Sequence, residues 1–243
     1  MRVCTIEARM TSSRLLGKVM KPILGRSMLE LMIERLRRAR RLDRIVIATT
    51  ENGTDDVIEA LAERIGVSCF RGSEDDVLGR VLGAAKAFGA DLIVETTGDC
   101  PLIDPFLVDQ VVNTFEANEV DYCDNCVVKS YPLGMAVQAF PVSVLEEIAR
   151  STSDPADREH VSLFIYEHPE RFRLLHVVSG FDEESASLRL TVDTAEDLAV
   201  VRSVFEALYP ENPEFGLQDV IRYLRAHPEV ATLNRGVIQK SAR

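Results

Sequence analysis

Three cationic side chains follow the first apolar segment of the chain, and two carboxylates follow later apolar segments. Arg9, Arg14 and Lys18 lie within "EARMTSSRLLGK", while Asp99 lies in "TTGDCPLID" and Asp193 in "TVDTAED". Carboxylate oxygens bind hard cations such as Mg²⁺, and cationic groups neutralise charge on a polyphosphate. The five residues together therefore predict a metal-assisted phosphate site.

Each of these positions also has a purely structural explanation. Gly17 could only provide a turn, Asp99 could be a turn residue, and Asp193 could assist a helix cap. The loop contains neither G-x-x-x-x-G-K-[ST] nor G-x-G-x-x-G, so neither P-loop hydrolysis nor dinucleotide redox chemistry is supported. The functional interpretation is favoured because the residues gather at the ends of predicted strands.

The apolar pattern alternates between strands and helices in the first half of the chain. Near-continuous apolar runs predict strands covered on both faces, at residues 3–8, 44–50, 67–70 and 91–97. Apolar residues spaced for one helix face predict helices at residues 27–39, 54–66, 73–90 and 105–118. Ser27 and Glu30 form a capping box, Ser73 is expected to cap the third helix, and Gly66 to end the second.

The second half of the chain is less regular. Strands are predicted at residues 135–140, 173–178 and 188–192, and helices at 154–169, 194–208 and 216–228. The alternation predicts an α/β fold with a doubly wound, mostly parallel, Rossmann-like sheet. We expect a single domain over 1–243, with an inserted arm at about 124–176 and a helical C-terminal tail at about 210–243. Ligands of such sheets bind at the carboxyl ends of the strands.

Charge and composition narrow the class of ligand. The net charge of the 243 residues is -11, which argues against general nucleic-acid binding. Residues 1–44 nevertheless hold 12 Lys and Arg against 4 Asp and Glu, which suits a small anionic ligand. No apolar run approaches the roughly 20 residues of a membrane span. With five cysteines and no signal peptide, we expect a cytoplasmic protein with reduced thiols.

Several ordered motifs resemble one enzyme family. "IEARMTSSRLLGK" resembles the nucleotide-binding signature of sugar-acid cytidylyltransferases, while "FRGSEDDVLGR", "TGDCPLID", "DREHV" and "TVDTAEDL" resemble the spore coat polysaccharide biosynthesis protein F family. That family is related to 3-deoxy-manno-octulosonate cytidylyltransferase, and the resemblance covers about residues 3–208. It implies a nucleotidyltransferase-like fold, a homodimer formed through the arm, and Mg²⁺-dependent transfer of CMP from CTP to a sugar or sugar acid, with release of pyrophosphate.

The resemblance also implies roles by position. The residues expected to bind the nucleotide are Ala8, Arg9, Met10, Arg14, Gly17, Lys18, Gly72 and Ser73. Arg14 and Lys18 would hold the triphosphate and act with Asp99 in catalysis, and Asp99 and Asp193 would bind Mg²⁺. The residues expected to reach the acceptor are Gln138, Arg158 and His160. His160 is also a candidate general base, because its ordinary pKa lies near 6.5.

The sequence departs from the family pattern near the expected ligand side. Glu7 replaces Gln or Pro and places an anion beside the phosphate loop, and Glu95 stands where relatives often carry Arg. Ala136 and Gln138 replace acidic residues, and Leu16 replaces a Pro. We infer retained nucleotide handling with an altered acceptor. The alternatives are another acceptor or nucleotide, such as an amino sugar, a phosphonate or GTP, and a catalytically degenerate nucleotide-binding protein.

Overall fold

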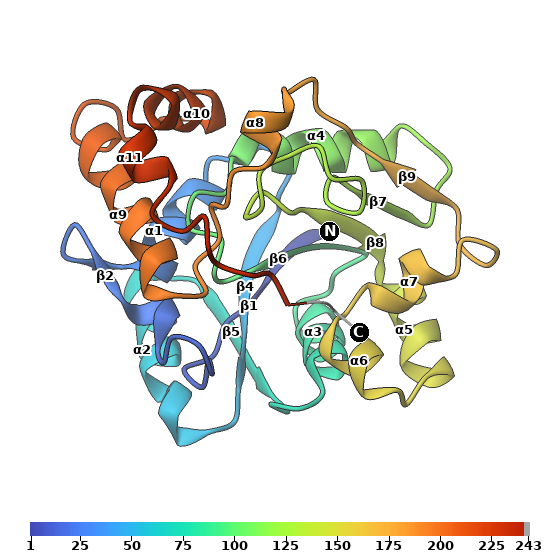
Figure 1. Cartoon of the computed structure of the whole chain (residues 1–243). Coiled ribbons are helices and arrows are strands. Elements are labelled where there is room, and N and C mark those ends of the chain that lie inside the picture. Colours follow the sequence, from blue (N-terminus) through green and yellow to red (C-terminus); the bar gives the residue numbers. More distant parts are fainter. Residues whose placement is uncertain (241–243) are drawn as a thin grey trace.

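A computed structural model describes residues 1–240, and they form a central sheet flanked by helices (Figure 1). The sheet has seven strands in the order β5-β4-β1-β6-β8-β7-β9. Their bounds are β1 Arg2–Glu7, β4 Arg44–Thr50, β5 Ser68–Gly72, β6 Leu92–Thr97, β7 Tyr122–Asp124, β8 Gln138–Pro141 and β9 Leu174–His176. A separate two-stranded sheet pairs β2 (Pro22–Ile23) with β3 (Arg26–Ser27).

Parallel pairing dominates the sheet. Strands β5, β4, β1 and β6 are parallel to one another, and β7 is parallel to β9, whereas β8 runs antiparallel to both β6 and β7. The prediction of a mostly parallel α/β sheet is therefore confirmed. The chain extends the sheet from β1 through β4 to β5, then returns to β6 on the other side of β1. This change of direction creates a topological switch point, beside which ligands of such folds bind.

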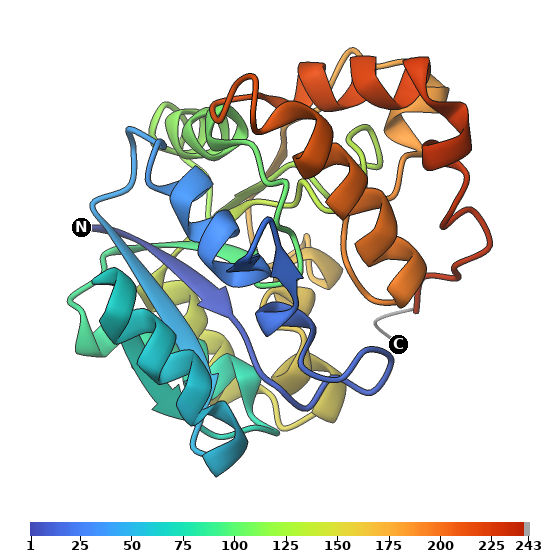
Figure 2. The ribbon, with the colours of Figure 1, turned by 90° about the vertical axis from the view of Figure 1, so that its left-hand side faces the viewer.

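Helices cover both faces of the sheet. Helices α1 (Met28–Leu36), α2 (Asp56–Ile65), α4 (Pro105–Glu116), α9 (Ala195–Leu208) and α10 (Leu217–Ala226) contribute to one large apolar core. Helices α3 (Val77–Ala87), α5 (Val142–Ser151) and α7 (Leu163–Glu167) form a second core on the other face. Figure 2 shows α9 and α10, in orange and red, on the side of the molecule that carries α1.

The remaining helices are short. They are α6 (Pro155–Glu159), α8 (Glu183–Ala186), α11 (Pro228–Ala231) and the 3₁₀ turns η1 (Lys18–Met20) and η2 (Gly53–Asp55). The helix predicted over 154–169 is thus two short helices, α6 and α7, because the backbone at His160 is extended. The extended residue lets the segment turn over the end of β8, and residues 159–162 of this turn line a cavity together with Gln138 of β8.

Local signals explain most helix ends. The Ser27 hydroxyl accepts a hydrogen bond from the Glu30 amide, and Gly66 ends α2 in the left-handed conformation. The prediction that Ser73 caps the third helix is wrong. The Ser73 hydroxyl accepts from the Asp76 amide in a preceding turn, and the Asp76 carboxylate caps α3. Both residues are good caps, so the pattern alone did not separate the turn from the helix.

The strand predicted at 188–192 is not a strand in the structure. Among the described residues it makes a single isolated bridge, between Arg189 and Leu133. Its apolar residues, Leu190 and Val192, are buried in the core nevertheless. Burial without a neighbouring strand gives the same alternating pattern as a half-buried strand, which explains the error.

The segment predicted as an inserted arm, residues 124–176, lies within the main architecture. It supplies β8 and β9 to the sheet, and its helices α5 and α6 pack against α3. The segment predicted as a helical tail, residues 210–243, begins with α10 and α11, and residues 241–243 lie outside the described part. The arm is therefore a continuation of the sheet, and its expected role in a dimer stays a prediction.

Candidate active site

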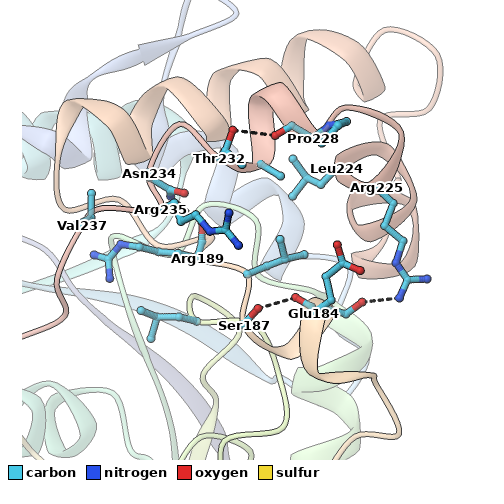
Figure 3. Close-up of a pocket in the computed structure, with 14 residues that line it drawn as sticks. Glu184, Ser187, Arg189, Leu224, Arg225, Pro228, Thr232, Asn234, Arg235 and Val237 are labelled. Atoms are coloured by element: carbon cyan, nitrogen blue, oxygen red, sulfur yellow. Dashed lines mark hydrogen bonds between the residues drawn. The ribbon is translucent and has the colours of Figure 1, made fainter.

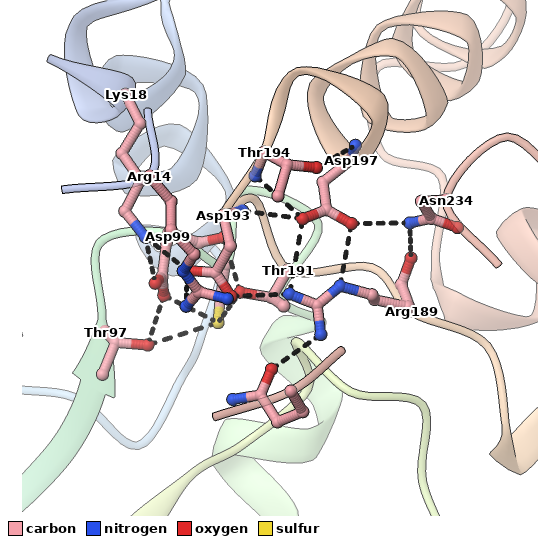
Figure 4. Close-up of polar contacts among 12 residues, drawn as sticks. Arg14, Lys18, Thr97, Asp99, Arg189, Thr191, Asp193, Thr194, Asp197 and Asn234 are labelled. Atoms are coloured by element: carbon pink, nitrogen blue, oxygen red, sulfur yellow. Dashed lines mark hydrogen bonds and ion pairs between the residues drawn. The ribbon is translucent and has the colours of Figure 1, made fainter. Parts of the chain in front are cut away.

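Three segments meet at the carboxyl ends of β1 and β6. Lys18, from the loop after β1, places its Nζ 2.7 Å from Asp99 Oδ2 and 2.9 Å from Asp193 Oδ1. Arg14 Nη2 lies 2.8 Å from the same oxygen of Asp193. Figure 4 shows the four side chains converging from three parts of the chain. The structure thus brings together the two cations and two carboxylates that the sequence pattern selected.

Short backbone contacts hold the two carboxylates side by side. The Gly98 amide donates to Glu7 O at 2.8 Å, and a Cβ at position 98 would lie 2.8 Å from the same oxygen. Glycine is therefore required for the end of β6 to approach β1 so closely. The Val192 amide then donates to Asp99 O at 2.8 Å. This bond joins the loop after β6 to the loop before α9, so Asp99 and Asp193 are placed by the main chain.

The loop after β1 is closed on itself. The Gly17 amide donates to Met10 O at 2.9 Å, and Gly17 has a φ of 63°, which favours glycine. The buried carboxylate of Asp55 accepts from the Met10 amide at 2.8 Å and also binds the Thr50 hydroxyl. The loop is therefore anchored to the end of β4 and turns at Gly17, which delivers Lys18 to the carboxylates at the start of η1.

Electrostatics favours the charged forms at this site. Burial by itself would lower the pKa of Lys18, but the charges and hydrogen bonds of Asp99 and Asp193 outweigh it and raise that pKa. Burial likewise opposes ionisation of Asp99, but Lys18 and the Thr97 hydroxyl lower its pKa below the ordinary value. The Thr97 hydroxyl donates to Asp99 Oδ1 at 2.6 Å. The site consequently favours a charged Lys18 ammonium beside an ionised Asp99.

The two aspartates fit a divalent cation. Both already bind one cationic group, the Lys18 ammonium, through oxygen atoms. Oxygen donors of this kind suit Mg²⁺, which keeps part of its coordination shell for water and substrate phosphates. In the described part of the chain, no group of three or more His, Cys, Asp or Glu residues is arranged to bind a metal. A cation here would thus need further ligands from a bound substrate.

Arg189 braces the carboxylate of Asp193. Its Nη2 lies 2.6 Å from Asp193 Oδ2, and its Nε donates to Asp197 Oδ1 at 2.8 Å. Asn234 donates to the same Asp197 oxygen at 2.8 Å, and the Asp193 amide donates to the other Asp197 oxygen at 2.9 Å. Figure 4 shows this network on the side of Asp193 opposite Lys18. Asp193 is therefore held from both sides.

The other residues predicted to bind nucleotide lie nearby, outside this cluster. Arg9 Nη1 is 3.4 Å from Glu74 Oε1, and the Thr11 hydroxyl and the side-chain amide of Asn52 also donate hydrogen bonds to Glu74. Gly72 ends β5, and the adjacent Ser73 is exposed. Glu74 thus connects the segments that follow β1, β4 and β5. Ala8 and Met10 belong to the first of these segments. The roles of these residues in nucleotide binding stay predictions.

A cavity of about 380 Å³ opens beside the aspartates, on the face of the sheet that carries α3. Gln138 and His160 line it together with Glu7, Glu95 and Thr97, and the role of Gln138 and His160 in acceptor binding stays a prediction. Arg158 does not line it, because its guanidinium binds Asp76 and the carbonyl oxygen of Ala149. The structure therefore places Arg158 in a contact between α6 and the start of α3.

A family model described as Cytidylyltransferase matches residues 3–221. The chain belongs to the cytidylyltransferase family. It is 32% identical over 232 residues to the spore coat polysaccharide biosynthesis protein SpsF of Bacillus subtilis, covering 93% of this chain and 95% of that protein. It is 37% identical over 119 residues to an 8-amino-3,8-dideoxy-manno-octulosonate cytidylyltransferase of Shewanella, covering 47% of each chain.

The fold comparison agrees. A solved cytidylyltransferase structure from Leptospira borgpetersenii superposes with a TM-score of 0.89 at 35% identity, covering 95% of this chain and 96% of that one. The predicted identity as a cytidylyltransferase related to the spore coat and sugar-acid enzymes is thereby confirmed. The roles of individual residues of this cytidylyltransferase stay predictions.

Sequence reasoning missed several residues of the site in this cytidylyltransferase. Arg189 and Asn234 gave no signal, because their contacts join segments far apart in the chain. Asp197 had a weak signal, since Thr194 and Asp197 have the spacing of a capping box, which the structure contains. Asp55 and Glu74 were visible only as acidic residues near helix starts. They organise the ends of three strands, which a one-dimensional pattern does not show.

The cytidylyltransferase has a second, larger cavity of about 550 Å³ between α8, α10 and the C-terminal segment (Figure 3). Arg189, Arg225 and Asn234 line it, while Lys18, Asp99 and Asp193 do not. It therefore lies behind the aspartates, on the far side of Arg189. Among the described residues, no helix combines the length and apolar character needed to cross a membrane.

Proposed function

We propose that this cytidylyltransferase transfers CMP from CTP to a hydroxyl group of a sugar-class acceptor and releases pyrophosphate. One observation carries the proposal: the Lys18 ammonium lies between Asp99 and Asp193, with Arg14 on the same Asp193 oxygen. The names of the relatives support a sugar-derived acceptor, since they include a polysaccharide biosynthesis protein and a sugar-acid cytidylyltransferase.

The cations and the carboxylates of the site have different roles in this proposal. Arg14 and Lys18 bind the phosphates that leave as pyrophosphate, and their positive charge stabilises the charge that develops there. Asp99 and Asp193 would hold a divalent cation, which supplies further neutralisation of phosphate charge when bound. Lys18 is poised to exchange its carboxylate contacts for phosphate oxygens. Arg189 keeps Asp193 in place while that exchange occurs.

Thr97 connects the cavity proposed for the acceptor with the site proposed for the phosphates. Thr97 lines the 380 Å³ cavity, and its hydroxyl also donates to Asp99 Oδ1 at 2.6 Å. An acceptor in the cavity therefore has its reacting hydroxyl close to the phosphate site. The acceptor oxygen attacks the α-phosphorus in line with the departing pyrophosphate, and positioning accounts for a large part of the rate gain. His160, exposed at the rim of the cavity, is the candidate to take the proton.

Two measurements test the proposal. Thermal unfolding with CTP, GTP, UTP or ATP and Mg²⁺ identifies the nucleotide, because a ligand that binds only the native state raises its apparent stability. We expect CTP to raise the unfolding temperature most. Pyrophosphate release from CTP is then measured with a panel of sugars and sugar acids. Stabilisation by GTP alone would assign another nucleotide, and CTP binding without pyrophosphate release for any acceptor would indicate a binding protein.

A further inference from the structure

A buried glutamate, Glu95, and a half-buried one, Glu7, form the floor of the cavity beside the aspartates. In the sheet register Thr5 pairs with Glu95, and Glu95 pairs with Gln138, so these three side chains point to the same face. Side chains alternate between the two faces of a sheet, and Glu7 is two residues after Thr5. Glu7, Glu95 and Gln138 therefore share the face that carries α3. The cavity over this face is lined by all three, and by Glu159, His160 and Ser162 from the turn between α6 and α7.

When both glutamates are ionised, the floor oxygens have no donor from the protein. Glu95 is only 4% exposed, and neither its Oε2 nor Glu7 Oε1 receives a hydrogen bond from the N–H and O–H groups of the described residues. The Gln138 amide oxygen, which faces the same cavity, already accepts from Tyr122 and Ser162 hydroxyls. Buried acceptors without donors are costly, so the floor is built to receive hydrogen bonds from a bound molecule.

The cavity also lacks a countercharge. None of the described residues that line it is a lysine or arginine. Arg80 is the cation whose charge acts on Glu7, but it lies outside the lining, and its Nη1 is bonded to the Ser73 and Glu74 carbonyls. The two glutamates lie close enough to share a hydrogen bond when one of them holds a proton, and burial raises the pKa of both. A cationic group that binds both oxygens would take the place of that proton.

Several ligand groups can be compared against this floor. A carboxylate would meet two buried carboxyl groups and no cation, so its charge would be desolvated without a partner. A hydroxyl would donate one hydrogen bond and neutralise nothing. An ammonium carries three donors and one positive charge, which satisfies both open oxygens and supplies the absent countercharge. Charge-assisted hydrogen bonds of this type are about twice as strong as neutral ones.

We propose that the acceptor carries a primary amino group, and that its ammonium binds between Glu7 Oε1 and Glu95 Oε2 on the floor of this cavity. This inference rests on the proposed function, because it treats the cavity as the acceptor site. The acceptor class is then an amino sugar that does not present a carboxylate to the floor. Thr97 links the floor to Asp99, so an acceptor anchored at the glutamates directs another part of the molecule to the phosphate site.

Calorimetric titration of the full chain tests this assignment without requiring turnover. CMP and Mg²⁺ are present, so that no transfer can occur, and the probes are D-glucosamine, N-acetyl-D-glucosamine, D-glucose and D-glucuronate. We expect D-glucosamine to bind at least tenfold more tightly than the other three. Equal or tighter binding of glucose or glucuronate would overturn the proposal, as would the absence of glucosamine binding.

Variants identify the groups responsible. Glu95→Gln keeps the side-chain size and removes the charge, and should weaken glucosamine binding at least tenfold without affecting glucose. Glu146→Gln, a partly exposed glutamate on α5 that pairs with Lys86 and does not line the cavity, is the control and should stay within twofold. If Glu95→Gln fails to fold, Glu7→Gln provides the same test, and thermal stabilisation by CTP reports folding. Wild-type affinity in the folded variant would overturn the proposal.

Failure of this inference is distinguishable from failure of the proposed function. Pyrophosphate release that is fastest with a sugar acid would preserve the CMP-transfer function and overturn the amino-group assignment. Glucosamine selectivity that depends on Glu95, without CTP binding or pyrophosphate release, would preserve the amino site and contradict the transfer reaction.

Discussion

Asp99 and Asp193 are bound by one ammonium group, with Lys18 Nζ 2.7 Å from the first and 2.9 Å from the second. The two aspartates come from different loops, which the Val192 amide joins by its hydrogen bond to Asp99 O. The arrangement resolves the repulsion of two close carboxylates before any ligand binds. It also means that ligand binding must redistribute the contacts of Lys18.

Replacement of the central cation should damage catalysis more than folding. Lys18→Met removes a cation that is held against the leaving phosphates in our account, and it leaves the two aspartates without their shared partner. We expect kcat for pyrophosphate release to fall by about a hundredfold or more. Lys86→Met, which removes an exposed lysine of α3, is the matched control and should stay within twofold. Equal activity of the two variants would refute the assigned role.

The turn at Gly17 should be needed for nucleotide binding. An alanine there would adopt a φ of 63° and place its Cβ 2.9 Å from Met10 Cε, whereas at Gly25 the φ is 75° with nothing within 4 Å. Both changes carry a backbone cost of about 1–2 kcal/mol. Only Gly17→Ala should also weaken CTP binding, measured by calorimetry, because it strains the turn next to Lys18 and moves the side chain of Met10, a residue predicted to bind the nucleotide. Similar CTP affinity for the two variants would show that the turn is only structural.

Arg189 should act as a positioning residue for the metal carboxylate. Arg189→Met would release Asp193 and leave Asp197 without its cation, and we expect the Mg²⁺ concentration for half-maximal pyrophosphate release to rise by about tenfold. Arg189→Lys should restore part of the affinity. Arg222→Met, on the exposed surface of α10 with a side chain 74% exposed, is the control. An unchanged Mg²⁺ requirement in Arg189→Met would argue against metal binding by Asp193.

The glutamate pair should make the protein less stable as the pH rises. Burial raises the pKa of Glu95 to about 8, and the pKa of Glu7 is also raised by burial and by Glu95, while Arg80 acts in the opposite direction. Asp99 is the other charge that acts on Glu7. Between the ordinary glutamate pKa and about pH 8, the native state therefore binds more protons than the unfolded state. Stability must then fall as pH increases through this range.

Chemical denaturation at a series of pH values measures this effect. Each proton contributes a slope of about 1.4 kcal/mol per pH unit where the difference is fully developed. Glu95→Gln removes one titrating group, so its free energy of unfolding should decline less between about pH 5 and 8 than that of the wild type. Glu146→Gln serves as the control and should follow the wild-type curve. Parallel curves for all three proteins would show that Glu95 titrates normally.

The sequence predicted the elements whose pattern is set by burial on both sides. The strands that became β1, β4 and β6 are apolar over most of their length because helices cover both of their faces, and this leaves little ambiguity. The run at 188–192 shows the limit of that reasoning. Leu190 and Val192 are as buried as strand residues, but their amides donate to the carbonyl oxygens of Leu133 and Asp99, which lie outside the strands. The hydrophobic pattern of a sequence indicates that a residue is buried, but it does not indicate which element packs against it.

The site was predictable where chemistry required unusual residue types at strand ends. Lys18, Asp99 and Asp193 met that condition, and Glu7 was noted as an anion that opposes its basic loop. The structure changes the interpretation of Glu7, whose carboxyl group lies in the cavity with Glu95. Arg158 lies outside that cavity and binds Asp76, which its position in a motif did not predict, because the partner of a long side chain depends on packing between helices.

The central claim is that Lys18, Asp99 and Asp193 act as one unit in CMP transfer. A double-mutant cycle tests it most directly, with kcat/KM for pyrophosphate release from CTP measured for wild type, Lys18→Met, Asp99→Asn and the double variant, using the acceptor with the fastest wild-type release. Residues that act as a unit are strongly non-additive. We predict that the double variant is no slower than the slower single variant. Full additivity of the two losses, or wild-type turnover in either single variant, would contradict the account.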